Sequence, residues 1–241
     1  RTILLAFACI ITALSSVGNV AQPGLWHAGG SNPFTLLFPE DAAFFQQIQM
    51  EREVVSIDLY PGFAVVKVQY WMNNPLDTTV RIRTGYPTNQ VVDYDGKASN
   101  KMEVGYDSLY KVQVFVNGVE TALLDFDDEV ADQWRIRETT FAADTTTLIE
   151  VYFLVQTGNS EVIDGYSNET LEGLIYVLET GGLWKQPIVS GEIRLQLRGT
   201  MKITDIHGVY PDSAFRMHKD GTFFLYQFEN LSPTGEDNIA I

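Results

Sequence analysis

The amino-acid sequence predicts an all-β protein, an antiparallel β-sandwich of about ten strands with long loops and at most one or two short helices. Between Met50 and Phe228, apolar side chains recur mainly at every second position, which is the period of a strand with one buried face. Pairs of glycine, proline and asparagine interrupt this alternation at short intervals, as turns between strands do. Helical spacing of apolar residues is almost absent.

A short helix is expected before the first long strand, over residues 39–49. Pro39 suits the first helical turn because its fixed φ matches the helix and its missing N–H is not needed there. Acidic residues follow it at once, which is a further feature of helix starts.

Residues 55–72 predict the first hairpin. Apolar and polar residues alternate over residues 55–59 and again over residues 64–72. Pro61-Gly62 lies between the two runs and favours a turn, so the runs are expected to pair.

Asn117-Gly118 predicts a second, tight hairpin. Both residue types adopt the left-handed backbone conformation that a two-residue hairpin loop requires, and residues 112–116 before them alternate. Further strands are expected at residues 80–83, 134–137, 148–156, 173–178, 193–198, 202–209 and 222–228.

The N-terminal residues predict an exported protein. Residues 1–21 begin with a cation, continue with about a dozen apolar residues and end in small and polar ones, which is the layout of a signal peptide. The apolar run is shorter than the roughly 20 residues of a membrane span. A hydrophobic N-terminal strand or an anchor helix is the alternative. Residues 22–33 read as a linker and residues 34–241 as the β-domain, with two sub-sandwiches divided near residues 158–172 as the alternative.

The cysteine content limits the chemistry of the chain, and its net charge limits the classes of partner. The single cysteine, Cys9, lies in the predicted signal peptide, so the mature chain is expected to be stable without disulfides and to lack thiol chemistry. A net charge of −15 disfavours nucleic acids and anionic membrane surfaces as partners. We therefore expect a periplasmic, cell-surface or secreted bacterial protein whose partner is a protein or a glycan.

Calcium is the one metal for which the sequence offers candidates. The densest acidic cluster comprises Asp125, Asp127, Asp128 and Glu129. Carboxylates on a loop can bind Ca²⁺, although a solvated turn is the simpler interpretation. The histidines His27, His207 and His218 show no zinc-binding spacing.

The sequence predicts no catalytic residues and no cofactor. It has no Gly-x-Ser-x-Gly motif, and with 31 acidic residues it offers many carboxylate pairs but no distinctive one. A hydrolase remains the alternative if the fold brings His207 or His218 within hydrogen-bond reach of a hydroxyl and a carboxylate.

Aromatic residues are the clearest candidates for binding. Rings exposed on a sheet can stack on sugars or on partner side chains. The candidates are Trp71, Trp134, Trp184 and Tyr176. The second interpretation, which we favour for each tryptophan, is that the ring fills an edge of the core. For the segment 176–188 we expect this second role, with Trp184 folded back over the core edge after a turn at Gly181-Gly182.

Several segments together carry a family resemblance. They are residues 50–54, 73–87, 115–118, 134–152, 176–188 and 233–239. In these segments the chain resembles a group of exported bacterial proteins of unknown function and, more distantly, the β-sandwich domain of vault proteins and inter-alpha-trypsin inhibitors. The resemblance implies an envelope location and a β-sandwich fold. The expected function is a non-catalytic structural or protein-interaction domain, and the alternative is a carbohydrate-binding or carbohydrate-active accessory module.

Overall fold

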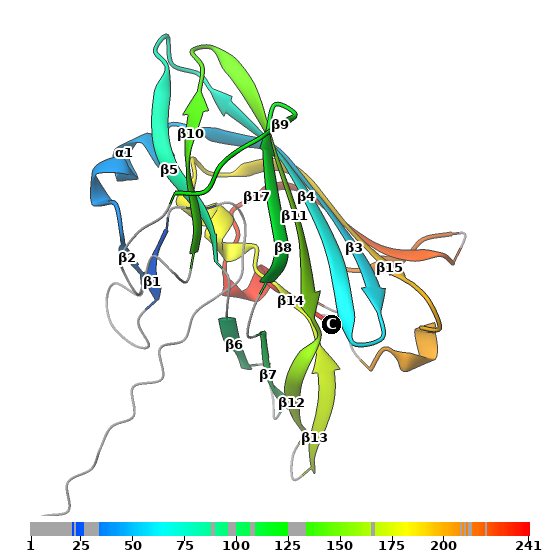
Figure 1. The fold of residues 1–241 in the computed structure, drawn as a ribbon. Coiled ribbons are helices and arrows are strands. Elements are labelled where there is room, and N and C mark those ends of the chain that lie inside the picture. Colours follow the sequence, from blue (N-terminus) through cyan, green and yellow to red (C-terminus); the bar gives the residue numbers. More distant parts are fainter. Residues whose placement is uncertain are drawn as a thin grey trace, which may run out of the picture.

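The computed structural model of the protein describes residues 21, 23–26, 34–87, 90–95, 100–106, 109–124, 134–164, 167–207, 209, 211, 214–219 and 221–241. Within these ranges the chain is mostly β-structure, as the alternation predicts, and α1 (Ala42–Phe45) is the one α-helix (Figure 1). Of the predicted signal peptide, only Ala21 is described. No helix in these ranges is long and apolar enough to cross a membrane.

An eight-stranded sheet forms the larger layer of the fold (Figure 1). Its strands lie in the order β16 (Arg216–Met217), β17 (Phe223–Leu231), β15 (Ile188–Leu197), β3 (Gln49–Tyr60), β4 (Phe63–Asn74), β11 (Thr145–Gln156), β8 (Leu109–Val116) and β9 (Val119–Glu120). Every neighbouring pair is antiparallel except β15 and β3, which run parallel. The sheet is therefore mixed, not wholly antiparallel as predicted. Turn residues in the sequence indicate pairing only between strands that are adjacent in the chain. They could not predict the parallel pair, because parallel strands are joined by a long crossover connection.

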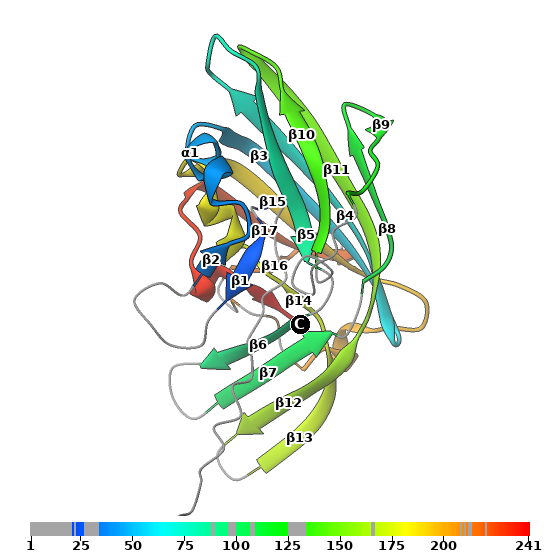
Figure 2. The ribbon, with the colours of Figure 1, turned by 60° about the vertical axis from the view of Figure 1, so that its left-hand side comes forward.

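Shorter elements cover one face of this sheet (Figure 2). β5 (Val80–Pro87) and β10 (Trp134–Phe141) pair with each other and form a two-stranded unit, the β5–β10 ribbon. The other short elements on this side are β1 (Gly24–Trp26), β2 (Phe34–Leu36), η1 (Pro39–Asp41), β14 (Ile175–Tyr176), η3 (Glu179–Leu183), η5 (Gly235–Asp237) and β18 (Ile239–Ala240). The short helix η4 (Ile203–Asp205) has no buried residue. β14 pairs with β18, and β1 pairs with β2.

A second, four-stranded sheet extends from one end of the larger one (Figure 2). Its order is β13 (Ser167–Gly173), β12 (Gly158–Asp164), β7 (Asn100–Tyr106) and β6 (Gln90–Asp95). β12 begins two residues after the end of β11, so one stretch of chain contributes to both sheets. Residues 158–172, the alternative domain boundary in the sequence, form most of the β12–β13 hairpin.

Both predicted hairpins are confirmed. β3 and β4 pair along nearly their whole length around Pro61-Gly62, where Gly62 has a φ of 83°. β8 and β9 pair around Asn117-Gly118, and these residues have φ values of 49° and 78°. Two consecutive positive φ angles are the conformation that an Asn-Gly hairpin loop adopts at low cost.

Three sequence-based expectations were wrong in detail. The helix is shorter than residues 39–49, because residue 49 already begins β3. Residues 202–209 hold the short helix η4 in place of a strand: the Asp205 carboxylate accepts a hydrogen bond from the Lys202 amide at 2.8 Å and closes a helical turn. The presumed linker contains β1, which pairs with β2.

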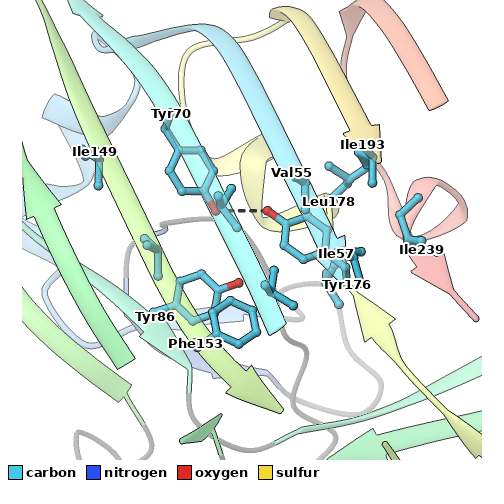
Figure 3. Packing of buried hydrophobic residues seen from close by; sticks show 14 of the residues in the cluster. Val55, Ile57, Tyr70, Tyr86, Ile149, Phe153, Tyr176, Leu178, Ile193 and Ile239 are labelled. Carbon is cyan, nitrogen blue, oxygen red and sulfur yellow. Dashed lines mark hydrogen bonds between the residues drawn. The ribbon is translucent and has the colours of Figure 1, made fainter. Parts of the chain in front are cut away.

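The main hydrophobic core lies between the eight-stranded sheet and the short elements (Figure 3). Alternate residues of β3, β4 and β11 point into it, and Val55, Val68 and Val151 lie side by side on the three strands. The predicted alternation is therefore confirmed as the origin of the core. Side chains of the opposite phase lie on the outer face, where they are exposed or half-buried.

Gly191 of β15 is expected to be essential for packing on the inner face. It pairs with Phe228 across the sheet, and a Cβ atom at residue 191 would lie 2.0 Å from Cζ of that ring. Gly191→Ala must therefore displace the ring, and we expect a loss of about 1–3 kcal/mol in the free energy of unfolding, measured by urea denaturation. Val189→Ala on the same strand is the control; its side chain is exposed, so its effect should stay below about 1 kcal/mol. Equal effects in both variants would contradict this role of Gly191.

Candidate interior binding site

A cluster of buried polar side chains interrupts the apolar inner face of the sheet. Glu53 on β3 and Tyr70 on β4 are cross-strand partners, and both are fully buried. Tyr176 of β14 lies over them, and its hydroxyl donates to Oε1 of Glu53 at 2.7 Å. The same hydroxyl lies 3.1 Å from the hydroxyl of Tyr70 (Figure 3). Three strands thus hold one continuous hydrogen-bonded chain in the interior.

The register of β3 explains why a carboxylate lies inside. Glu53 belongs to the same alternating phase as Val55, Ile57 and Leu59, all of which are buried. A register shift between Met50 and Arg52 brings Met50 inward as well. Gly191 is the neighbour of Glu53 on the other side, and its missing side chain leaves space on that side of the carboxylate for the ring of Phe228.

Arg137 provides a buried positive charge on the opposite wall. It lies on β10 opposite Thr84 and has the same strand phase as Thr139 and Phe141, which are also buried. Its relative exposure is 0%. Among the described residues, none accepts a hydrogen bond from its Nε, Nη1 or Nη2 atoms. The two threonines beside it bond to each other, with 2.7 Å between their hydroxyls.

The β5–β10 ribbon is fastened from its outer side. The backbone amide and Nε of Arg83 donate to Oδ2 of Asp41 at 3.0 and 2.8 Å. The guanidinium also lies 4.0 Å from the ring centroid of Phe38. These contacts tie the ribbon to η1, so that its other face, which carries Arg137, is held toward the core.

Burial favours the uncharged form of both Arg137 and Tyr176. Burial lowers the pKa of Arg137 to about 10, and the influence of Tyr70 opposes this decrease. Burial, followed by the charge of Glu53, raises the pKa of Tyr176 well above its usual value. At neutral pH the site therefore combines the positive guanidinium of Arg137 with the protonated phenol of Tyr176. This arrangement suits hydrogen bonding to an anion.

The structure places three of the four aromatic candidates in the interior. Trp184 is fully buried, with its ring centroid 4.4 Å from that of Phe45 and 6.0 Å from that of Phe141. Trp134 packs over Gly85 in a smaller cluster with Ala21 and Ile136. Both rings fill the core, so their faces are not available to a saccharide. Tyr176 is buried too, but its hydroxyl belongs to the polar cluster.

Trp71 lies apart from the other candidates, on the outer face of the sheet. Its side chain is half-buried, and the guanidinium carbon of Arg52 lies 5.2 Å from its ring centroid. Arg52 therefore stands over the surface on which a sugar would stack.

The metal and histidine candidates form no described site. Asp125, Asp127, Asp128 and Glu129 lie outside the described residues, as does His27. His207 is exposed, and the ring of His218 stacks on Phe223 at 4.4 Å. Within the described ranges, no three His, Cys, Asp or Glu side chains are grouped closely enough to hold a metal ion.

Sequence reasoning did not single out Glu53 or Arg137, although a signal for each was present. Glu53 has the phase of three apolar β3 residues, and Arg137 has the phase of Phe141. A charged residue at an inward position is unusual because burial of a charge is costly. A charged residue at a position where the alternation predicts an apolar one could therefore have identified both Glu53 and Arg137.

Solved structures resemble this fold at low sequence identity. A Legionella pneumophila subsp. pneumophila str. Philadelphia 1 protein, described as a candidate nutrient-binding protein, matches 93% of this chain and 69% of its own, with a TM-score of 0.57 and 12% identity. An M1 zinc metallopeptidase from Deinococcus radiodurans matches with a TM-score of 0.38 and 6% identity. Leukotriene A4 hydrolase from Saccharomyces cerevisiae matches with a TM-score of 0.37 and 8% identity.

The two enzymes are much longer than the part of them that this chain matches. Each of the two enzymes covers 81% of this chain, but the chain spans only 42% of the metallopeptidase and 29% of the hydrolase. No protein-family model and no curated protein matches the sequence. The Legionella protein therefore shows a shared fold.

Tyr176→Phe is expected to destabilise the protein. The variant removes the hydroxyl that donates to Glu53, and a buried acceptor that loses its donor costs about 1–3 kcal/mol in the free energy of unfolding. Urea denaturation measures this loss. Tyr110→Phe is the matched control because that side chain is exposed on the outer face. If the two variants lose equal stability, the Tyr176 hydroxyl does not hold the cluster together.

Proposed function

We propose that this protein is a non-catalytic, exported β-sandwich protein that binds a small anionic ligand in its interior. The ligand would lie between the eight-stranded sheet and the β5–β10 ribbon, the two walls of the sandwich. One observation carries the proposal: the guanidinium of Arg137 is fully buried, and no described residue accepts a hydrogen bond from it.

The electrostatics of burial support this role for Arg137. An isolated charge inside a protein loses several kcal/mol of hydration energy, which only a counter-charge and hydrogen bonds can offset. A guanidinium presents planar, paired N–H donors that match the two oxygens of an anion. Arg137 is also the one fully buried cation among the described residues.

The polar cluster supports binding over catalysis. Because its pKa is raised, Tyr176 keeps its proton at physiological pH and acts as a donor to Glu53. The shared fold of the Legionella protein, a candidate nutrient-binding protein, agrees with a binding role. Export is proposed from residues 1–21 of the sequence.

This proposal replaces the structural or protein-interaction domain expected from the sequence. It also ranks above the carbohydrate-binding alternative, for which Trp71 is the remaining described candidate and has Arg52 over its ring. A stacking platform would need open ring faces.

Arg137→Met tests whether the buried charge is compensated within the chain. If it is not, the variant removes an unfavourable charge, and the free energy of unfolding of the ligand-free protein should rise or stay unchanged, with a gain of up to about 4 kcal/mol. Arg135→Met, a half-buried neighbour on β10, should change it by less than about 0.5 kcal/mol. A loss of about 3–5 kcal/mol in Arg137→Met would mean that a carboxylate of the chain already pairs with Arg137, and would refute the proposal.

Ligand binding itself is tested by thermal melting in a panel of small carboxylates, phosphate, sulfate and neutral sugars. An anion that binds the native state must raise the melting midpoint in proportion to its concentration above Kd. The expected result is stabilisation by at least one anion in the wild type and in Arg135→Met, and none in Arg137→Met. Stabilisation by sugars alone would favour the carbohydrate alternative.

A further inference from the structure

Ala21 is part of the folded domain, although it is the last residue of the predicted signal peptide. Its relative exposure is 0%. Its amide donates to the carbonyl oxygen of Gly85 at 3.2 Å, and its own carbonyl oxygen accepts a hydrogen bond from the Gly85 amide at 2.9 Å. These two bonds form an antiparallel bridge that joins Ala21 to β5. Removal of Ala21 with the leader would take both partners away from Gly85.

The missing side chain of Gly85 allows the N-terminal segment to lie directly on the β5–β10 ribbon. A Cβ atom at residue 85 would lie 2.9 Å from Cγ of Pro23 and 3.0 Å from Cε3 of Trp134. Ala21 packs beside Trp134 in the smaller hydrophobic cluster. Pro23 is buried as well, and its carbonyl oxygen accepts a hydrogen bond from the Leu37 amide at 2.9 Å. Ala21 and Pro23 are therefore both fixed to the domain.

A chain that began at Gln22 would lose part of this arrangement. Gly85 is buried, and its amide and carbonyl groups would both lose the partners that Ala21 provides. Buried backbone groups without partners destabilise a fold. The new terminal ammonium group would also adjoin the buried Pro23, where a charge is costly. Retention of Ala21 is therefore favourable for the mature protein.

The sequence offers two bonds at which a leader of this layout could be cut. The apolar run ends at Leu14, and the cut could follow Gly18 or Ala21, which are both small. A leader cleavage site has small residues at two places, directly before the cut and two positions further back. For a cut after Gly18 the second place holds Ser16, which is small. For a cut after Ala21 it holds Asn19, which is larger, so the first bond fits better.

From these two lines of evidence, and resting on the export that forms part of the proposed function, we infer that the leader is removed at the bond between Gly18 and Asn19. The enzyme implied is a leader peptidase that recognises small residues. Water adds across the bond: the C–N bond breaks, the oxygen of water becomes part of the Gly18 carboxylate, and the Asn19 nitrogen takes up the protons as the new terminal ammonium group. The mature chain then begins at Asn19 and retains Ala21.

The N-terminus of the exported protein tests this inference. The full chain, preceded by an initiator methionine, is expressed in a Gram-negative bacterial host, and the periplasmic, membrane and cytoplasmic fractions are separated. N-terminal sequencing and intact mass spectrometry then identify the first residue in each fraction. We expect the periplasmic protein to begin at Asn19 and to have the mass of residues 19–241.

Two variants separate processing from folding. Gly18→Leu places a large residue directly before the inferred bond, so cleavage there should be lost and the uncut chain should accumulate. Ala21→Leu keeps Ser16 and Gly18, so it should be cut as in the wild type. Its larger side chain overpacks the cluster beside Trp134, however, and should lower the urea midpoint of the mature protein. The masses are measured on denatured samples, so cleavage of Ala21→Leu is read even if this variant folds poorly.

The outcomes that contradict the inference differ from failure of export. A mature chain that begins at Gln22 would place the cut after Ala21, as would loss of cleavage in Ala21→Leu but not in Gly18→Leu. Any other first residue in the periplasmic or membrane fraction, including that of an uncut chain, also overturns the inference, although export then stands. If the chain stays in the cytoplasm, the proposed export is wrong and the inference fails with it.

Discussion

The whole structure depends on covering one face of a long, curved sheet. Alternate residues of the central strands β3, β4 and β11 present an apolar inner face, and the β5–β10 ribbon, β14 and η3 close over it. Burial of this surface supplies most of the stabilising free energy, because the chain has no cysteine beyond Cys9 with which to form a disulfide. Trp184 is central to this closure, since its ring meets both α1 and β10.

Against this background the buried polar residues are costly exceptions. Glu53 and Arg137 occupy inward positions that an aliphatic residue would fill at no electrostatic cost. On the sheet, hydrogen bonding by Tyr176, which also contacts Tyr70, offsets the cost of burying Glu53. On the ribbon, no described residue accepts a hydrogen bond from Arg137, so the cost of burying its charge is not offset in this way. This difference between the two residues is the reason for proposing Arg137 as a binding group. The protein has a net charge of −15, and its long-range field repels anions. A fully buried cation is therefore unusual in this chain.

Local patterns predicted the long strands of the eight-stranded sheet, but they predicted neither the four-stranded sheet nor the site. Alternation and turn residues located both hairpins, since a Pro-Gly or Asn-Gly pair acts on its immediate neighbours. The same local rules could not reveal that β15 joins β3 in parallel, or that η4 replaces a strand where Ile203, Ile206 and Val209 recur at intervals of three. The site was missed for a related reason. The sequence analysis considered only the ring of Tyr176, whereas the role of its hydroxyl depends on Glu53, which lies 123 residues away in sequence.

The parallel junction of β15 with β3 also determines when the fold can be completed. Asp58 and Arg198, which are 140 residues apart, meet across this junction at 2.9 Å. Because β15 follows so much later in the chain, one edge of β3 stays unpaired until β15 is available. Pairing of such distant strands is slow, because a large loop has to close first. The amino-terminal half of the chain therefore reaches its final state only after the carboxy-terminal strands have been synthesised. An extended period without a closed core is compatible with transport of the polypeptide before it folds.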